Sequence, residues 1–180
     1  MEHHQQWLRQ TRHNHHWGDP MVQPKPRTTF RVLSRNVNTL STQNNYLQWK
    51  AAAQAITTSK ADTVSFQEPN VAWNKINKQW IQQILKQPTG NVLIATTVST
   101  EIQTLSHQWG GALQAILGDW VSCTANIGQD STGLGRWSFI ELQGKSDKWY
   151  ILLSGYRVCE NQCINLGSNN TYNQQYRLLH

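Results

Sequence analysis

The stretch FRVLSRNVN at residues 30–38 and the stretch TVSFQE at residues 63–68 decide the fold of this chain. Each is an apolar run that ends in carboxamide or carboxylate side chains, and the residues between them have the periodicity of a helix. A strand, a helix and a second strand predict a right-handed βαβ unit with parallel strands. Because ligands of open α/β sheets bind outside the carboxyl ends of parallel strands, we expect Asn36, Asn38 and Glu68 to lie at one rim.

The ligand atoms that this rim offers to a metal ion are oxygens. Mg²⁺, and also Mn²⁺, binds carboxylates, amide oxygens, water and substrate phosphate. Glu68 ends an apolar strand, where a buried carboxylate requires a cation or hydrogen-bond donors. Asn36 and Asn38 alternate across the strand end, so only one of them faces the ion if the strand stays regular. The sequence predicts a Mg²⁺ site, and turn formation is the alternative for both asparagines.

The composition favours an anionic partner such as nucleic acid. The 180 residues carry a formal net charge of +6 and the pI is about 9.4, although no run of Lys or Arg forms a dense patch. A soluble protein that is merely basic is the alternative. Nine tryptophans are unusual in one chain. They can stack on bases, but the apolar spacing of most of them favours burial.

The chain divides into two parts at about residue 27. Residues 1–27 are rich in His, Gln and Arg and lack apolar periodicity, which is typical of a disordered tail, and residues 28–180 have the pattern of one domain. Helices are expected from a cap at Ser41 or Thr42 through Ile56, at residues 71–86 and at residues 173–179. Strands are expected at residues 30–34, 63–67, 91–97, 111–117, 120–125, 136–142 and 149–156, the last five in an antiparallel meander.

Two features of the sequence bear on the compartment. No apolar stretch approaches the roughly 18 residues of a membrane span, and the N-terminus lacks the apolar core of a signal peptide. Cys123, Cys159 and Cys163 have no zinc-type spacing, so we expect free thiols. These features predict an intracellular protein, in the nucleus or the cytoplasm, with no membrane partner.

Later strand ends carry groups that suit phosphate. Arg136 opens a strand and Arg157 follows another, and guanidinium groups bind phosphate oxygens in pairs. The hydroxyl of Tyr156, at a strand end, can donate to a phosphate oxygen. Packing is the alternative for Tyr156, and a structural role at the edge of the meander is the alternative for Arg136.

Four segments together resemble the endonuclease/exonuclease/phosphatase superfamily, and they are similar to the apurinic-type endonuclease domains found beside reverse transcriptases in retroelements. The segments are residues 32–38, 61–69, 135–137 and 154–156. The resemblance covers residues 30–180, and the strand that ends in Glu68 is its most specific part. It implies an α/β (α+β) fold, the N-terminal part of a four-layer α/β sandwich with two mixed sheets face to face and helices outside.

The resemblance also implies an activity, the Mg²⁺-dependent hydrolysis of phosphodiester or phosphomonoester bonds. It implies that Asn36 and Glu68 belong to the metal site. Asn38 takes the neighbouring catalytic Asp or Asn role, and Tyr156 orients the phosphate. Nucleic acid is the implied partner.

The chain departs from the family pattern in ways that affect activity. No Asp-x-Asn triplet follows Tyr156, and no Asp-His pair ends the sequence. Because these motifs position the attacking water and complete acid–base catalysis, we expect a truncated domain that is weakly active or inactive alone. A non-catalytic nucleic-acid-binding module and a non-functional domain fragment are the alternatives.

Truncation has a consequence for packing. Half of such a sandwich leaves the inner face of its first sheet uncovered, and an exposed apolar face or edge favours association. We therefore expect a partner chain or self-association to cover this face.

Overall fold

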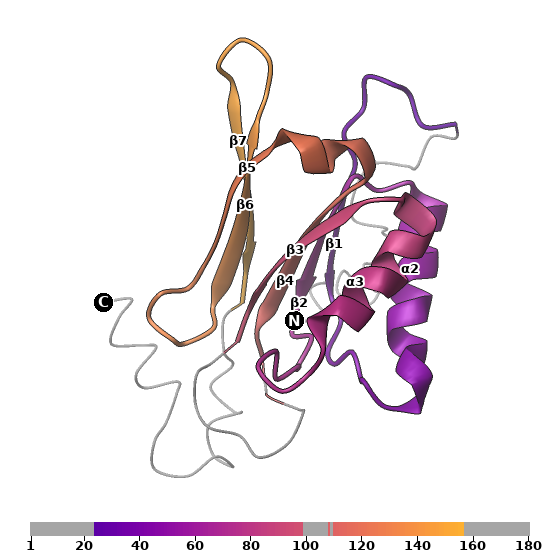
Figure 1. The fold of residues 1–180 in the computed structure, drawn as a ribbon, viewed down its shortest axis with the longest axis vertical. Helices are drawn as coiled ribbons and strands as arrows, with labels where there is room; N and C mark the ends of the chain where they lie inside the picture. Colours follow the sequence, from indigo (N-terminus) through magenta and orange to yellow (C-terminus); the bar gives the residue numbers. More distant parts are fainter. Residues whose placement is uncertain (1–23, 99–107, 109, 157–180) are drawn as a thin grey trace, which may run out of the picture.

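The computed structural model describes residues 24–98, 108 and 110–156, which form two β-sheets and two α-helices (Figure 1). The four-stranded sheet has the order β1-β2-β4-β3, and the three-stranded sheet has the order β5-β6-β7. The strands are β1 Val32–Asn36, β2 Thr63–Gln67, β3 Val92–Thr97, β4 Ala112–Leu117, β5 Thr124–Gln129, β6 Trp137–Gln143 and β7 Trp149–Gly155. The helices are α2 Leu47–Ser59 and α3 Lys78–Thr89, and the 3-10 helices are η1 Asn44–Tyr46 and η2 Gly118–Cys123.

The βαβ unit that the sequence predicts is present. β1 and β2 are parallel, and they pair in register from Val32 with Thr63 to Asn36 with Gln67. β2 has the predicted bounds. β1 ends two residues later than predicted, because Asn36 keeps its place in the ladder despite its polar side chain. The connecting helix begins only at α2, after left-handed residues in η1 that delay regular helix beyond the predicted cap.

β4 makes the four-stranded sheet mixed. It lies between β2 and β3 and is antiparallel to both. All six of its residues are buried, since the strand has a neighbour at each edge and a layer on each face. The predicted meander of the last five strands is therefore wrong for β3 and β4, which join the first sheet.

The remaining three strands do form a meander, in which β6 pairs antiparallel with β5 and with β7. The strand predicted at residues 120–125 is replaced by η2, and β5 begins at Thr124. The cause lies at Gly118, where a φ of 60° turns the chain out of β4.

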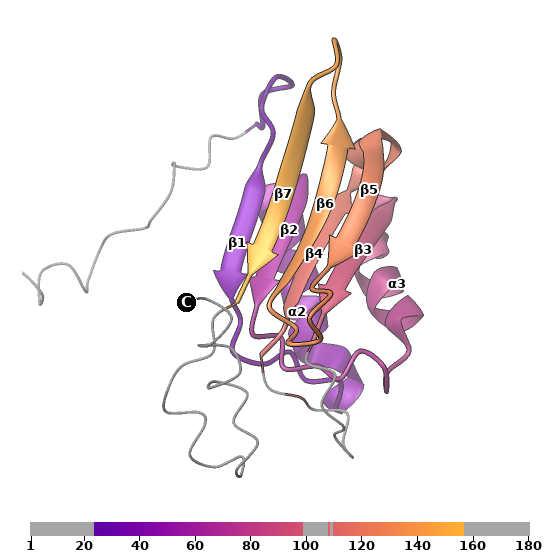
Figure 2. The same ribbon diagram turned by 90° about the vertical axis from the view of Figure 1, so that its left-hand side faces the viewer.

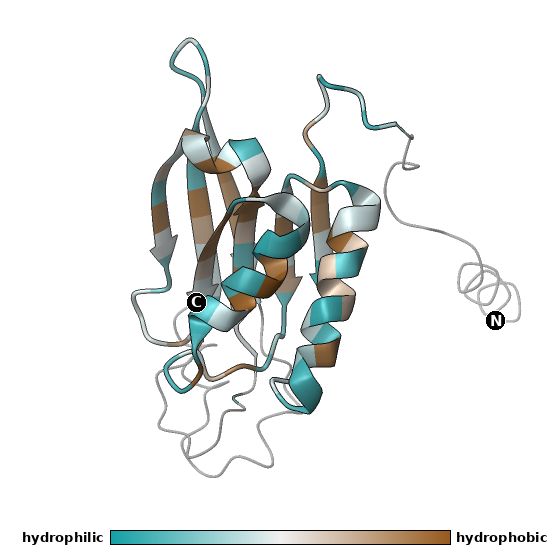
Figure 3. Cartoon of the chain, turned by 45° about the vertical axis from the view of Figure 1, so that its right-hand side comes forward, coloured by the Kyte–Doolittle hydropathy of each residue, from teal (hydrophilic) through white to brown (hydrophobic). Residues whose placement is uncertain are grey.

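The two sheets pack face to face, and α2 and α3 cover the outer face of the four-stranded sheet (Figure 1). Figure 3 shows the two helices side by side, with hydrophilic residues on much of their outward surface. The core between helices and sheet includes Trp49, Ile56, Ile81 and Leu85, each at most 1% exposed. The core between the sheets contains Ala95, Ile116, Ile140 and Leu142. The described residues thus make three layers of the expected sandwich.

The inner face of the four-stranded sheet is better covered than expected. Thr63 and Ser65 of β2 are buried, and so is Gln114, their neighbour on β4. The expectation of an uncovered inner face is wrong for β2, β3 and β4, because the second sheet folds back over them. Within the described residues, no helix covers the outer face of the second sheet (Figure 2).

The second helix begins later than predicted. The side-chain oxygen of Asn77 accepts a hydrogen bond from the backbone two residues on, at 3.0 Å, and so caps α3. Trp73 is buried ahead of the helix, whereas Trp80 on α3 is 55% exposed. The prediction of a buried aromatic stripe is therefore wrong for Trp80.

Some expectations lie outside the described residues. The predicted tail, residues 1–27, is described only from residue 24, and the helix predicted at residues 173–179 is not described. None of the helices in the described part of the chain has the length and apolar character needed to cross a membrane.

Trp49 tests the core between the helices and the sheet. Its side chain is fully buried, its ring centroid lies 6.0 Å from that of Trp73, and its Nε1 donates to the carbonyl of Leu40 at 3.1 Å. We expect Trp49→Ala to lower the free energy of unfolding by about 3–5 kcal/mol in urea denaturation, through lost packing and a lost hydrogen bond. Trp80→Ala is the matched control, with an expected change within about 0.5 kcal/mol. Equal losses in the two variants would contradict this assignment of the core.

Candidate metal and phosphate site

Two of the predicted site residues meet where β1 and β2 end. Asn36 is the last residue of β1, and Glu68 directly follows β2. The Nδ2 group of Asn36 donates a hydrogen bond to Oε1 of Glu68 at 2.8 Å. Parallel pairing therefore brings an amide and a carboxylate together at one rim of the sheet. Their role as metal ligands stays a prediction.

Asn38 lies in the loop that follows β1. Its backbone N–H donates to Oδ1 of Asn36 at 3.0 Å, which is the asparagine turn chemistry that is the alternative to metal binding. Asn38 has a left-handed φ of 42° and an exposed side chain. The loop thus uses the oxygen of Asn36, which still has a second lone pair for an ion.

Backbone hydrogen bonds hold the loops after β1 and β2 together. The N–H groups of Val37, Thr39 and Leu40 donate to the carbonyls of Gln67, Glu68 and Pro69 at 3.0, 2.8 and 2.9 Å, respectively. The pairing of the two strands therefore continues past their last ladder residues. It keeps Asn36 and Glu68 side by side even though the loops have left-handed residues.

Asn70 connects three loops at this rim. It is 3% exposed and has a φ of 55°. Its Nδ2 donates to Oγ1 of Thr39 at 2.7 Å, and its Oδ1 accepts from the backbone of Gly110 at 2.5 Å. Its own N–H donates to the carbonyl of Gly110 at 3.1 Å. The side chain thus joins the loops after β1 and β2 to the segment before β4.

Tyr156 reaches the same region through Gly110. A Cβ atom added to Gly110, whose φ is 80°, would lie 2.4 Å from Cε1 of Tyr156, so the tyrosine ring packs directly on this glycine. The backbone N–H of Tyr156 donates to the carbonyl of Arg136 at 2.7 Å. The adjacent residue Gly111 accepts a hydrogen bond from the N–H of Glu68 at 3.1 Å. Tyr156 and Glu68 therefore flank one short glycine segment.

Asp130 and Arg136 form a second polar cluster, in the turn between β5 and β6. Asp130 is 6% exposed, and its carboxylate accepts hydrogen bonds from the backbone N–H groups of Thr132 and Arg136, each at 2.9 Å. Burial alone would raise the pKa of Asp130, but the hydrogen bonds of Thr132 and Arg136 and the charge of Arg136 outweigh it and lower the pKa. Burial lowers the pKa of Arg136, and Asp130 offsets part of that effect.

The guanidinium group of Arg136 is under-satisfied. Its Nε and Nη2 atoms are buried and find no hydrogen-bond acceptor in the described part of the chain. A buried guanidinium donor without an acceptor is costly, so this group suits an anionic oxygen. The turn that fixes Asp130 also fixes the start of β6 and, through the backbone of Arg136, the position of Tyr156.

The rim fits a hard divalent ion only in part. Mg²⁺ commonly uses one or two protein carboxylates and completes its shell with water and phosphate, so Glu68 with the amide oxygen of Asn36 is a suitable but small ligand set. Among the described residues, no three His, Cys, Asp or Glu side chains cluster as a metal site. The ion therefore requires water or substrate oxygens for most of its coordination.

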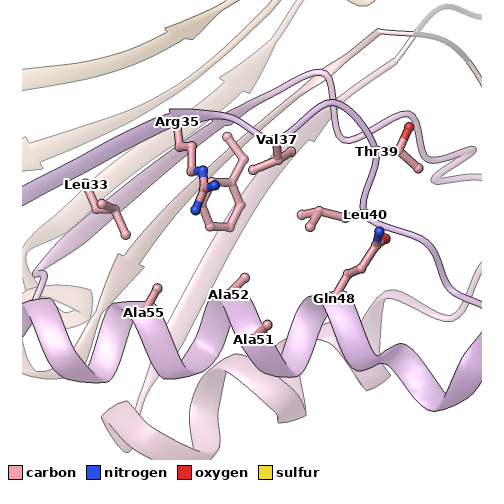
Figure 4. Close-up of a pocket in the computed structure, with 10 residues that line it drawn as sticks. Leu33, Arg35, Val37, Thr39, Leu40, Gln48, Ala51, Ala52 and Ala55 are labelled. Atoms are coloured by element: carbon pink, nitrogen blue, oxygen red, sulfur yellow. The ribbon is translucent and has the colours of Figure 1, made fainter. Parts of the chain in front are cut away.

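A groove of about 230 Å³ lies on the other face of β1, between this strand and α2 (Figure 4). Leu33 and Arg35 of β1, Phe66 of β2 and three alanines of α2 line it, and the guanidinium of Arg35 extends into it. Side chains alternate along a strand, so Asn36 points to the opposite face. The groove is therefore separate from the candidate site.

Sequence reasoning missed Asn70 and Asp130. Asn70 follows Pro69 and precedes an apolar run, a context in which Asn takes a left-handed turn conformation. Asp130 precedes a Thr by two residues within a Gly-rich segment, and this spacing is typical of an aspartate turn. Both signals are local. The signal at Asn70 does not reveal the distant loops that its side chain contacts, and the signal at Asp130 does not reveal the link from its turn to Tyr156.

Solved structures of the endonuclease/exonuclease/phosphatase family have a similar fold. One is a family protein from Leptotrichia buccalis C-1013-b, with a TM-score of 0.53, 15% identity, and coverage of 84% of this chain and 61% of that one. Another is an AP endonuclease from Archaeoglobus fulgidus, with a TM-score of 0.53, 13% identity, and coverage of 84% and 48%. A third is D. rerio TDP2 complexed with a single-strand DNA product, with a TM-score of 0.50, 15% identity, and coverage of 83% and 52%.

The predicted resemblance is thus confirmed at the level of the fold, and so is the α/β class. The chain spans about half to three fifths of the length of these solved structures. No protein-family model matches the sequence, and no curated protein matches it.

Asp130 gives a pH-dependent test of the turn that positions Tyr156. Because folding lowers the pKa of Asp130, the charged carboxylate stabilises the fold at neutral pH. This stabilisation begins to fall when the pH drops below the unfolded-state pKa of 3.8, and it is lost below the lower pKa of the folded state. We expect Asp130→Asn to reduce the free energy of unfolding by about 1–3 kcal/mol at pH 7. The difference from the parent should shrink below pH 3.8.

The matched control is Asp147→Asn, since Asp147 lies in the next turn with an exposed side chain. Urea denaturation of the three proteins between pH 2.5 and pH 7 measures the effect. A constant difference between Asp130→Asn and the parent over this range would show that the carboxylate charge does not stabilise the turn.

Proposed function

We propose that this chain is a divalent-metal-dependent phosphodiester hydrolase domain that acts on nucleic acid, with Mg²⁺ as the metal and Mn²⁺ as a substitute. The contact of Asn36 with Glu68 carries the proposal, because it places an amide and a carboxylate at the carboxyl ends of two parallel strands. The fold supports it, since its solved neighbours include an AP endonuclease and a protein bound to a single-strand DNA product.

Each proposed role follows from the position of a side chain. Glu68 and Asn36 would hold the ion, which supplies positive charge to the phosphate oxygens. Asn38, on the adjacent loop, would supply a second amide to the phosphate or its water. Tyr156 would donate its hydroxyl to a phosphate oxygen and so orient the scissile group. Asn70 is a positioning residue, because it acts on the site through the loops that it joins.

The basic charge supports an anionic polymer as the partner. A net charge of +6 attracts a phosphate backbone without specifying its sequence. We expect slow turnover, because Glu68 is the carboxylate in contact with Asn36 and the carboxylate of Asp130 is already bound by the backbone of its own turn. Activation of the attacking water then depends on groups beyond this small ligand set.

Replacing Glu68 tests the metal site and the hydrolase activity together. We expect the purified chain to cleave abasic-site duplex or single-stranded oligonucleotides with Mg²⁺ and not with chelator. We expect Glu68→Gln to reduce this rate about 100-fold or more, as for other groups that stabilise developing charge. The same substitution should weaken Mn²⁺ binding measured by water-proton relaxation, a readout that does not require turnover.

Glu141→Gln is the matched control, because Glu141 lies in β6, away from the strand ends. Both variants should unfold at the same urea concentration as the parent. Unchanged Mn²⁺ binding in Glu68→Gln would contradict the metal site. Cleavage that persists in chelator would contradict a metal-dependent mechanism.

A non-catalytic nucleic-acid-binding module is the second candidate, favoured by the small ligand set at the rim. Binding of single-stranded oligonucleotides would then weaken with salt as phosphate contacts are lost, and it would persist with chelator. Metal-independent binding without cleavage would favour this function over hydrolysis.

A further inference from the structure

Two strand edges remain open on the same side of the described sandwich. β1 ends the four-stranded sheet and β7 ends the three-stranded sheet, and Figure 2 shows them on the same side of the molecule. Open edges expose unpaired backbone N–H and C=O groups to any extended chain. This side is therefore where both sheets could be extended.

Within the described part of the chain, β7 lacks the features that usually protect an edge. Its sequence, WYILLSG, contains no charge and no proline, and it pairs with β6 without a bulge along its whole length. Trp149, Ile151 and Leu153 share its outer face and are 51%, 65% and 63% exposed. A strand that is apolar on its outer face and unprotected at its edge is typical of the interior of a sheet.

The inner face of β1 is the counterpart of this open edge. Val32 is 59% exposed and Ser34 is also exposed, whereas Thr63 and Ser65, their ladder partners on β2, are buried. Residues paired in a ladder point to the same face, so the second sheet covers β2 and stops short of β1. Three strands thus lie over a four-stranded sheet, and the position over β1 is the one left uncovered.

We propose that an extended, uncharged β-strand of another polypeptide pairs with the free edge of β7 and lies over β1. One such strand would satisfy the backbone groups of β7 and cover Val32. Its inward side chains would be buried against Val32, and its outward side chains would lie beside Ile151 and Leu153 and extend their exposed apolar face. The partner segment is therefore an uncharged strand with an apolar inward face, and it binds by β-strand addition.

A second copy of this chain does not fit this position. β7 packs over β2 and β4, so a symmetric pairing of two β7 strands would place the second copy's own β2 under its β7. That position is already taken by β1 of the first copy. A strand that brings no underlying sheet avoids this collision.

The solved neighbours show that the fold has room for more polypeptide. This chain spans 61%, 48% and 52% of their lengths. A polypeptide that supplies further strands of such a fold would contain an uncharged, extended segment of the kind that the edge of β7 requires. The proposal does not depend on metal binding or hydrolysis at Glu68.

The probe for this site is a labelled peptide with the sequence of β7, WYILLSG, flanked by lysines for solubility. We expect saturable binding to the full chain by fluorescence anisotropy. The β7 amides that do not pair with β6 should exchange hydrogen at least about 10-fold more slowly when the peptide is bound. Val32→Gln should weaken binding about 10-fold, because the new amide would be buried without a partner under the added strand. Leu47→Gln, on α2, is the control, since Leu47 is similarly exposed at 62%.

The competing occupants give different results. Equal binding by the parent and Val32→Gln would overturn the proposal. Protection, in the free chain, of the β7 amides that do not pair with β6 would overturn it too, because the edge would then be occupied. So would a concentration-dependent dimer that the peptide disrupts, which would identify a second copy as the occupant. Glu68→Gln should bind the peptide like the parent, which separates failure here from failure of the proposed hydrolase function.

Discussion

The parallel pairing of β1 with β2 is the constraint on which the candidate site depends. A parallel pair places both carboxyl ends at the same rim, and here the ladder ends with Asn36 beside Gln67. Three further backbone hydrogen bonds extend the pairing into the loops. The contact between Asn36 and Glu68 is therefore fixed by main-chain geometry, and Asn70 extends this support to the segment before β4.

That support balances unfavourable backbone conformations. Asn38, Thr39, Glu68 and Asn70 all have positive φ values, between 42° and 94°. Each such conformation costs on the order of 1 kcal/mol for a residue with a side chain, and it persists only where the surroundings determine it. Such clusters are frequent at functional sites, where they orient side chains that regular strands would direct elsewhere.

Sequence periodicity predicted the elements whose signals are local. β2 has the predicted bounds, because Thr63 and Gln67 limit an apolar run between a turn and a proline. The same reasoning failed where tertiary contacts decide. Short apolar strands have the same pattern in a meander as in a mixed sheet, so the place of β4 between β2 and β3 was not predictable from spacing. Trp80 has helical spacing like its buried neighbours, but the start of α3 at Asn77 turns it outward.

The residues of the candidate site also divide into those with a local sequence signal and those set by tertiary contacts. Asn36 and Glu68 were found because strand ends are visible in a sequence. Asn70 acts on loops 31 and 40 residues away, and no short window of sequence contains those partners. Asp130 binds residues of its own turn, but its link to Tyr156 runs through the backbone of Arg136 and is not visible in the sequence.

The central position of β4 also sets an order for folding. β3 pairs only with β4 among the described strands, so it cannot join β2 until β4 has been synthesised. On the ribosome, an emerging chain that ends near Thr97 would hold a βαβ unit whose β2 edge still lacks its antiparallel neighbour. Contacts between distant segments form slowly, and exposed strand edges favour misassociation in the interval. The 14 residues that separate β3 from β4, residues 98–111, therefore determine how long a nascent chain remains vulnerable to aggregation.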